Sequence, residues 1–139
     1  MMQALRDPDG ANIDRIQIVK GWLDASGQTQ EKVYDVAWSD SDSRKVGSDG
    51  KVPSVGTTVD EKEATYTNTI GAPSLTGYWQ DPEFNPKLKA FYYVRVLEIP
   101  TPRWLAYDRK NYNLYDVMPK DILYSSQERA YSSPIWYQP

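Results

Sequence analysis

The run AFYYVRVLEIP, residues 90–100, constrains the fold more than any other part of this sequence. It is rich in aromatic and β-branched residues, which favour strands. Both of its alternating faces are apolar except at Arg95 and Glu98, and such a strand is typical of a position inside a sheet. The sequence therefore predicts a central strand that runs directly into a Pro-Thr-Pro-Arg-Trp corner at residues 100–104.

Two further runs, residues 13–24 and 31–40, alternate between apolar and polar positions with the period of two expected of strands. In the first run Ile16, Ile18 and Trp22 fall on one face. The Ser-Gly-Gln sequence between the two runs is a turn signal. Together these features predict a long antiparallel hairpin.

Shorter strand-like runs follow at 64–71, 74–81 and 131–138. Residues 39–57 are rich in Ser, Gly and Asp and predict a polar loop, whereas residues 101–130 show no sustained period. We expect an extended segment pinned by aromatic residues there, with one helical turn near 119–123. Six strands separated by turn signals predict an all-β fold, a single antiparallel β-sandwich domain of 139 residues with a long irregular C-terminal segment.

The composition excludes several classes of function. The chain has no histidine and no cysteine, so it lacks Ser-His-Asp and Cys-His nucleophiles, ordinary zinc sites and disulfides. Its net charge is −3 with acids and bases interspersed, which does not favour nucleic-acid binding. No apolar run approaches the roughly 18 residues of a membrane span, and the N-terminal residues have no apolar stretch typical of a secretory signal. We therefore expect no catalytic residue, no nucleic-acid partner and no membrane partner for this chain.

A cluster of oxygen-bearing side chains near the N-terminus raises the possibility of calcium binding. Asp7, Asp9, Asn12 and Asp14 surround Gly10, and oxygen ligands on a tight glycine turn suit calcium. The run lacks the ligand spacing of an EF-hand loop. Turn chemistry at the entry of a strand explains these residues equally well.

The chain contains 5 Trp and 11 Tyr but only 2 Phe, which suggests that aromatic side chains serve at the surface as well as in the core. Several fall in irregular sequence after the proline corner, where burial against a partner surface is plausible. The candidate interface or substrate-rim residues are Arg103, Trp104, Tyr107, Tyr112 and Tyr115. Carbohydrate stacking on exposed aromatics is an alternative. For Arg103, a packing or cation–π contact with a nearby tyrosine is also open.

Four long stretches carry a resemblance to a known family: GANIDRIQIVKGWLDASGQTQEKVYDVAWSD, TYTNTIGAPSLTGYWQDPEF, AFYYVRVLEIPTPRWLAYD and QERAYSSPIWYQP. They resemble the C-terminal end of a large, mainly bacterial family designated domain of unknown function 3604 (DUF3604). The resemblance extends from about Arg6 to Pro139.

The resemblance implies a larger parent protein. Full-length members look like PHP-type metal-dependent hydrolases related to the amidohydrolases, with upstream histidines and carboxylates that bind divalent metals. None of those ligands has a counterpart here, so the divalent metal is implied only for the upstream domain. Many members carry an export signal, which suggests a periplasmic or secreted location. The resemblance therefore implies a terminal β domain on its own.

Two functions from different classes remain open at this point. In the first, the chain is a non-catalytic C-terminal structural and substrate-rim domain, whose partner is the upstream metal-binding catalytic domain or a second copy of itself. In the second, it is a free-standing β-sandwich module that binds a carbohydrate or a protein ligand through exposed aromatics.

Overall fold

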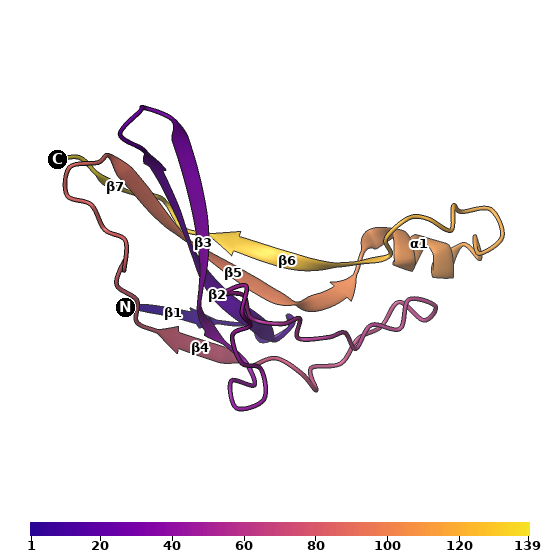
Figure 1. The fold of residues 1–139 in the computed structure, drawn as a ribbon. Coiled ribbons are helices and arrows are strands. Elements are labelled where there is room, and N and C mark those ends of the chain that lie inside the picture. Colours follow the sequence, from indigo (N-terminus) through magenta and orange to yellow (C-terminus); the bar gives the residue numbers. More distant parts are fainter.

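The computed structural model describes residues 1–139 and contains seven strands and one helix (Figure 1). In chain order these are β1 (Met2–Leu5), β2 (Ile13–Leu23), β3 (Thr29–Trp38), β4 (Ser74–Gly77), β5 (Ala90–Pro102), α1 (Trp104–Asn111), β6 (Ser125–Tyr131) and β7 (Ile135–Tyr137).

Two antiparallel sheets pack against each other, which confirms the predicted all-β sandwich. The larger sheet has the order β3-β2-β5-β6, and β7 also pairs with β5; the smaller sheet consists of β1 and β4. Contact between the sheets is close at Gly77 of β4, where an added Cβ would lie 3.1 Å from the side chain of Val36 and 3.2 Å from that of Ala37.

The central position of β5 is confirmed. One of its edges pairs with β2, from Ala90 opposite Trp22 to Glu98 opposite Ile13. Its other edge is shared, because β7 pairs with the first residues of β5 and β6 pairs with the stretch that begins at Arg95. The predicted hairpin is also confirmed, as β2 and β3 pair along almost their whole length.

The predicted proline corner is wrong in part, because β5 continues through Pro102 and pairs there with Ser125 of β6. The region that follows also differs from the prediction. Trp104–Asn111 form an α-helix, α1, where an extended segment was expected, and no helix forms near residues 119–123. Only Ala106 of α1 is buried, so the helix has almost no apolar periodicity for a sequence pattern to reveal. Arg109 and Lys110 lie in its last turn, where positive charge is favourable. No helix of the structure is long and apolar enough to cross a membrane.

Several strand assignments also differ, and the strand predicted at 74–81 is confirmed only as β4, Ser74–Gly77. Residues 64–71 form no strand and contribute only an isolated bridge between Asp60 and Thr65. Strands β1 and β6 were not predicted, because β1 is only four residues long and β6, SSQERAY, is mostly polar. The predicted last strand is confirmed only as the short β7, directly after Pro134.

The buried core contains charge as well as apolar side chains. Its largest fully buried side chains are those of Ile13, Ile16, Ile99, Val19 and Asp14. The polar loop at residues 39–57 contributes three further buried side chains, those of Ser39, Arg44 and Val52. The loop is therefore fixed to the sheet at these three points.

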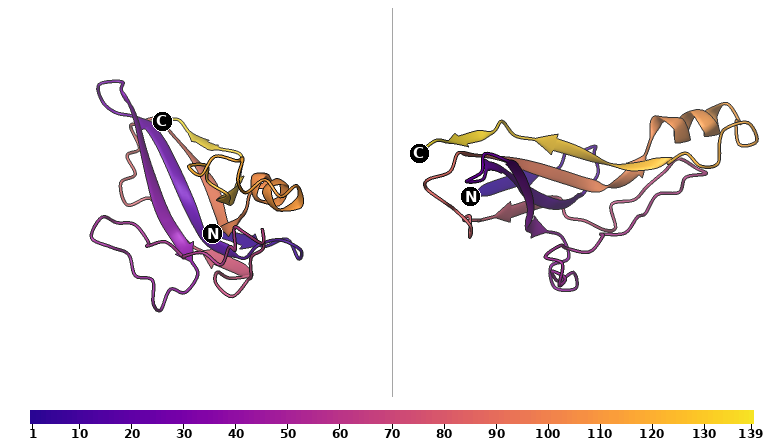
Figure 2. Two further views of the ribbon diagram at one scale, coloured as in Figure 1. Left: turned by 90° about the vertical axis from the view of Figure 1, so that its right-hand side faces the viewer. Right: turned by 45° about the horizontal axis from the view of Figure 1, so that its top comes forward.

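The C-terminal half of β5, β6 and α1 extend away from the packed sheets as a projecting end of the molecule (Figures 1 and 2). The two termini lie at the opposite end. Residues 103–124, which form the tip of this projection, are called the arm below.

Gly71 provides a test of the sandwich interior. Its φ is +75°, and an added Cβ would lie 2.6 Å from Ile99 Cγ2 and 2.8 Å from Asn12 Cβ. Gly56 has φ +87° with nothing within 4 Å of the added Cβ. Gly56→Ala should therefore cost about 1–2 kcal/mol of unfolding free energy from backbone strain alone, and Gly71→Ala about 3 kcal/mol or more because overpacking is added. Urea unfolding measures both values, and equal losses would contradict the packing at Gly71.

Candidate functional site

The arm brings together most of the predicted interface residues. Trp104, Tyr107 and Tyr112 are exposed, at 65%, 43% and 70% of their surface. Arg103 donates a hydrogen bond from Nη1 to the carbonyl oxygen of Leu123, at 3.3 Å. Tyr115 is half-buried instead, and its hydroxyl donates to the carbonyl oxygen of Lys62. Sequence patterns missed two further exposed apolar side chains of the arm, Val117 and Leu123.

A small apolar cluster supports the arm from inside. Ala64, Ala106 and Tyr124 form it, with Leu105, Met118 and Ile122 packed against them. Because this cluster uses the inner side chains of the arm, the exposed aromatics are not needed for its internal packing.

Arg109 fastens the arm to the chain segment that runs beside it. Its guanidinium lies 3.6 Å from the centre of the Tyr124 ring and 5.3 Å from that of Tyr115. Its Nη2 donates to the carbonyl oxygen of Glu61, and Lys110 donates to that of Glu63. It is thus Arg109, and not Arg103, that lies over tyrosine rings.

Three of the four side chains of the calcium hypothesis, those of Asp7, Asn12 and Asp14, make hydrogen bonds within the protein. Asp7 accepts the backbone N–H of Asp9, and the Asn12 amide donates to the carbonyl oxygens of Asn68 and Ile70. The buried Asp14 carboxylate binds two arginines. No group of three or more acidic side chains is placed to share a metal ion. Calcium binding stays a prediction, and the function proposed below does not use it.

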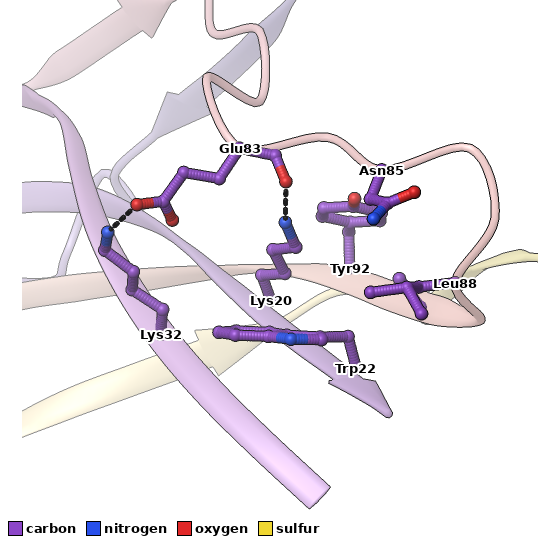
Figure 3. A pocket seen from close by; sticks show the side chains of 8 residues that line it. Lys20, Trp22, Lys32, Glu83, Asn85, Leu88 and Tyr92 are labelled. Carbon is purple, nitrogen blue, oxygen red and sulfur yellow. Dashed lines mark hydrogen bonds and ion pairs between the residues drawn. The ribbon is translucent and has the colours of Figure 1, made fainter. Parts of the chain in front are cut away.

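A separate hollow lies at the other end of the larger sheet, between β2, β3, β5 and the segment that follows β4 (Figure 3). We call it the Lys20 pocket. Its volume is about 430 Å³, and its lining residues are Lys20, Trp22, Lys32, Glu83, Asn85, Leu88, Ala90 and Tyr92.

Lys20 lies at the back of this pocket and is 4% exposed. Its ammonium is 2.7 Å from Asp81 Oδ2 and donates to the carbonyl oxygen of Glu83 at 3.0 Å. It also lies 5.0 Å from the centre of the Trp22 ring system, a cation–π arrangement. A buried lysine is tolerated only with such partners.

Two carboxylates attach the segment after β4 to the sheet. Asp81 accepts from Lys20 and from the Tyr92 hydroxyl, at 2.7 Å. Glu83 accepts from Lys32 at 2.6 Å and from the Tyr34 hydroxyl at 2.7 Å. This set connects β2, β3 and β5 to a segment with no strand of its own.

Trp79, from the same segment, fills the space between two of these tyrosines. Its ring lies 4.9 Å from that of Tyr34 and 6.1 Å from that of Tyr92, measured between ring centres. The aromatic contacts and the carboxylate contacts therefore fix the same segment on the same face of the sheet.

Burial and hydrogen bonds shift the pKa values of several groups in this set. Burial opposes ionisation of Asp81, but hydrogen bonds from Lys20 and Tyr92 outweigh it and hold the pKa of Asp81 below its ordinary value. Burial and the neighbouring carboxylates raise the pKa of both Tyr34 and Tyr92. The two tyrosines therefore stay protonated and act as hydrogen-bond donors to the carboxylates.

One sequence signal could have located this pocket. Strand alternation places Lys20 on the same face of β2 as Ile16, Ile18 and Trp22. A lysine on the apolar face of a strand predicts a buried counter-charge. The pattern does not say where along the chain that charge lies, because Asp81 is far from Lys20 in sequence.

Asp81→Asn tests the buried ion pair. The variant leaves the Lys20 ammonium buried without a counter-charge, which should cost about 3 kcal/mol or more at pH 7. Glu63→Gln, which breaks the exposed pair with Lys110, should cost less than about 1 kcal/mol. Urea unfolding of both variants gives the comparison.

The effect of Asp81→Asn on the unfolding free energy should also depend on pH in a defined direction. Because the folded pKa of Asp81 lies below its ordinary value of 3.8, its stabilising effect is complete above that value and is lost as the pH falls through the folded pKa. The difference in unfolding free energy between wild type and Asp81→Asn should therefore shrink from about pH 5 to about pH 2. A constant difference would show that the pKa of Asp81 is the same in the folded and the unfolded protein.

Comparison with known proteins identifies a family for this chain but no individual relative. No curated protein and no solved structure matches it. The sequence model of the family described as Protein of unknown function (DUF3604) matches residues 1–139, in agreement with the resemblance of the four stretches described above. The chain therefore belongs to the DUF3604 family.

Proposed function

We propose that this chain is a non-catalytic β domain that packs, through its arm, against the metal-binding catalytic domain of a DUF3604 hydrolase. In this arrangement it is the C-terminal structural domain of the larger protein and forms part of the rim of the substrate pocket. This proposal rests on the large apolar side chains that the arm exposes to solvent. These are Trp104, Tyr107, Tyr112, Val117 and Leu123, each between 43% and 75% exposed.

The composition of this surface supports a protein partner. Tryptophan, tyrosine and arginine are enriched where proteins bind one another, and contiguous exposed apolar surface commonly marks such sites. Arg103 and Leu123 lie near the two ends of the arm, and they are joined by a hydrogen bond. Docking of the arm would remove the apolar surface from water without any rearrangement of its inner cluster.

The rigidity of the arm also supports docking. The hydrogen bonds from Arg109 and Lys110 and the inner cluster hold the exposed residues in one arrangement. A surface that is fixed before binding loses little conformational entropy on association. Arg103 is presented on the same element, and its guanidinium suits a carboxylate or another anion at the rim of a partner's pocket.

The proposal predicts binding between this chain and the separately produced metal-binding portion of a family member. Sedimentation velocity should show a heterologous complex with the wild-type chain. The double variant Trp104→Ser, Tyr112→Ser should weaken the complex at least about tenfold. The reason is that each buried aromatic anchor commonly contributes about 2 kcal/mol or more to the free energy of binding at an interface.

Tyr78→Ser provides the matched control, because Tyr78 is 75% exposed but lies outside the arm. It should bind like the wild type. A wild-type chain that remains monomeric in the presence of the metal-binding portion would overturn the proposal. Concentration-dependent association with itself through Trp104 and Tyr112 would assign the arm to a second copy instead.

A further inference from the structure

We infer that the Lys20 pocket is a binding site for a neutral carbohydrate, with a pyranose ring lying against Trp22. This goes beyond the function proposed for the arm and does not depend on it. The pocket and the arm lie at opposite ends of β5 (Figure 1).

The shape of the pocket suits a small molecule with one flat apolar face. Figure 3 shows the indole of Trp22 along one side, Glu83 and Asn85 on the opposite side, and Lys20 and Tyr92 between them. The volume of about 430 Å³ lies in the range of small-molecule sites. A pyranose ring presents a face of C–H groups that stacks on an aromatic ring and a rim of hydroxyls that needs polar partners.

The charges of the pocket favour a neutral ligand. Lys20 is paired with Asp81 at 2.7 Å, and Lys32 with Glu83 at 2.6 Å. Two positive and two negative side chains therefore cancel. An anionic or cationic ligand would have to compete with one of these pairs, whereas a hydroxyl group can bind beside them as donor or acceptor.

The rim keeps unused hydrogen-bonding capacity of both kinds. The Asn85 side-chain oxygen accepts the backbone N–H of Lys87, and its amide nitrogen has no partner within the chain. Lys32 donates one of its three protons to Glu83, and each Glu83 carboxylate oxygen accepts a single hydrogen bond. Free donors on Lys32 and Asn85 and free lone pairs on Glu83 match the hydroxyl groups of a sugar.

The pocket is formed before any ligand arrives. Lys20 is held by two acceptors, and Glu83 by Lys32 and Tyr34. Pre-formed polar groups give a binding site its specificity at a low entropic cost.

Titration of the full chain with maltose, cellobiose and N,N′-diacetylchitobiose tests the inference. Isothermal titration calorimetry gives the affinity, and the indole N–H signals of the five tryptophans identify the site by NMR. Saturable binding of at least one sugar is expected, with a shift of the Trp22 signal. Trp22→Leu should weaken binding about tenfold or more by removing the stacking surface.

Lys32→Met supplies a second variant that is independent of Trp22. Lys32 and Glu83 are 45% and 51% exposed, so their pair adds little to stability, and the variant should fold while binding about tenfold more weakly. Lys110→Met is the matched control, because Lys110 and Glu63 form a pair of similar exposure, 41% and 54%, on the arm. It should bind sugar like the wild type.

Three results would overturn the inference. The first is no saturable binding of any of the three sugars, and the second is binding that Trp22→Leu and Lys32→Met leave unchanged. The third is tighter binding of glucuronate than of the neutral sugars, lost at high salt, since it would mean that the pocket carries uncompensated positive charge. The arm variant Trp104→Ser, Tyr112→Ser should retain sugar binding, so failure of the docking proposal and failure of this one are separable.

Discussion

The carboxylate of Asp14 is the interaction on which the larger sheet and its loops depend. It is 1% exposed and accepts from Arg44 at 2.6 Å, from Arg15 at 3.0 Å and from Gln127 at 2.9 Å. These partners come from β2 itself, from the loop at residues 39–57 and from β6. A buried carboxylate is tolerated only when its charge and its lone pairs are satisfied, so the three segments must meet at this point for the sheet to form.

The loops of this protein are held mainly by charge because the apolar core is small. Only 21 of 139 residues are buried, and seven of these are polar or charged. Arg44 extends the Asp14 contact to Ser39 and Pro53, and so fixes the loop that strand pairing does not reach. The Lys20–Asp81 pair does the same for the segment after β4. In both places a buried ion pair specifies where a chain segment without a strand lies on the sheet.

The regular part of the fold follows from local patterns. Alternation predicts β2 and β3, and the two apolar faces of residues 90–100 predict the central β5, because both signals report burial directly. Residues 64–71 were assigned as a strand from their β-branched and aromatic content. In the structure Asn68 and Thr67 bond to Asn12 and Thr58 through side chains, and these contacts replace a strand ladder. A local sequence pattern cannot predict hydrogen bonds of this kind, because their partners lie far away in the sequence.

The candidate surfaces were predictable to different degrees. Aromatic residues in sequence without periodicity pointed to Trp104, Tyr107 and Tyr112, and the arm does expose them. The same argument included Tyr115, which instead bonds to Lys62. The Lys20 pocket was missed altogether, because its lining comes from β2, β3, β5 and the segment after β4. Its chemistry exists only after the sheet has brought these four segments together.

The geometry of β5 links the two proposed functions. Its first residues, Ala90 and Tyr92, line the Lys20 pocket, and its last, Pro102, leads into the arm. Thirteen strand residues span about 40 Å, and β2, β6 and β7 pair with β5 along this length. A partner docked on the arm and a sugar held on Trp22 would thus be separated by a fixed distance, because β5 and the strands paired with it connect the two sites. Taken together, the two proposals describe a domain that would keep a saccharide at a defined distance from a docked partner, a role that requires neither histidine nor metal in the chain itself.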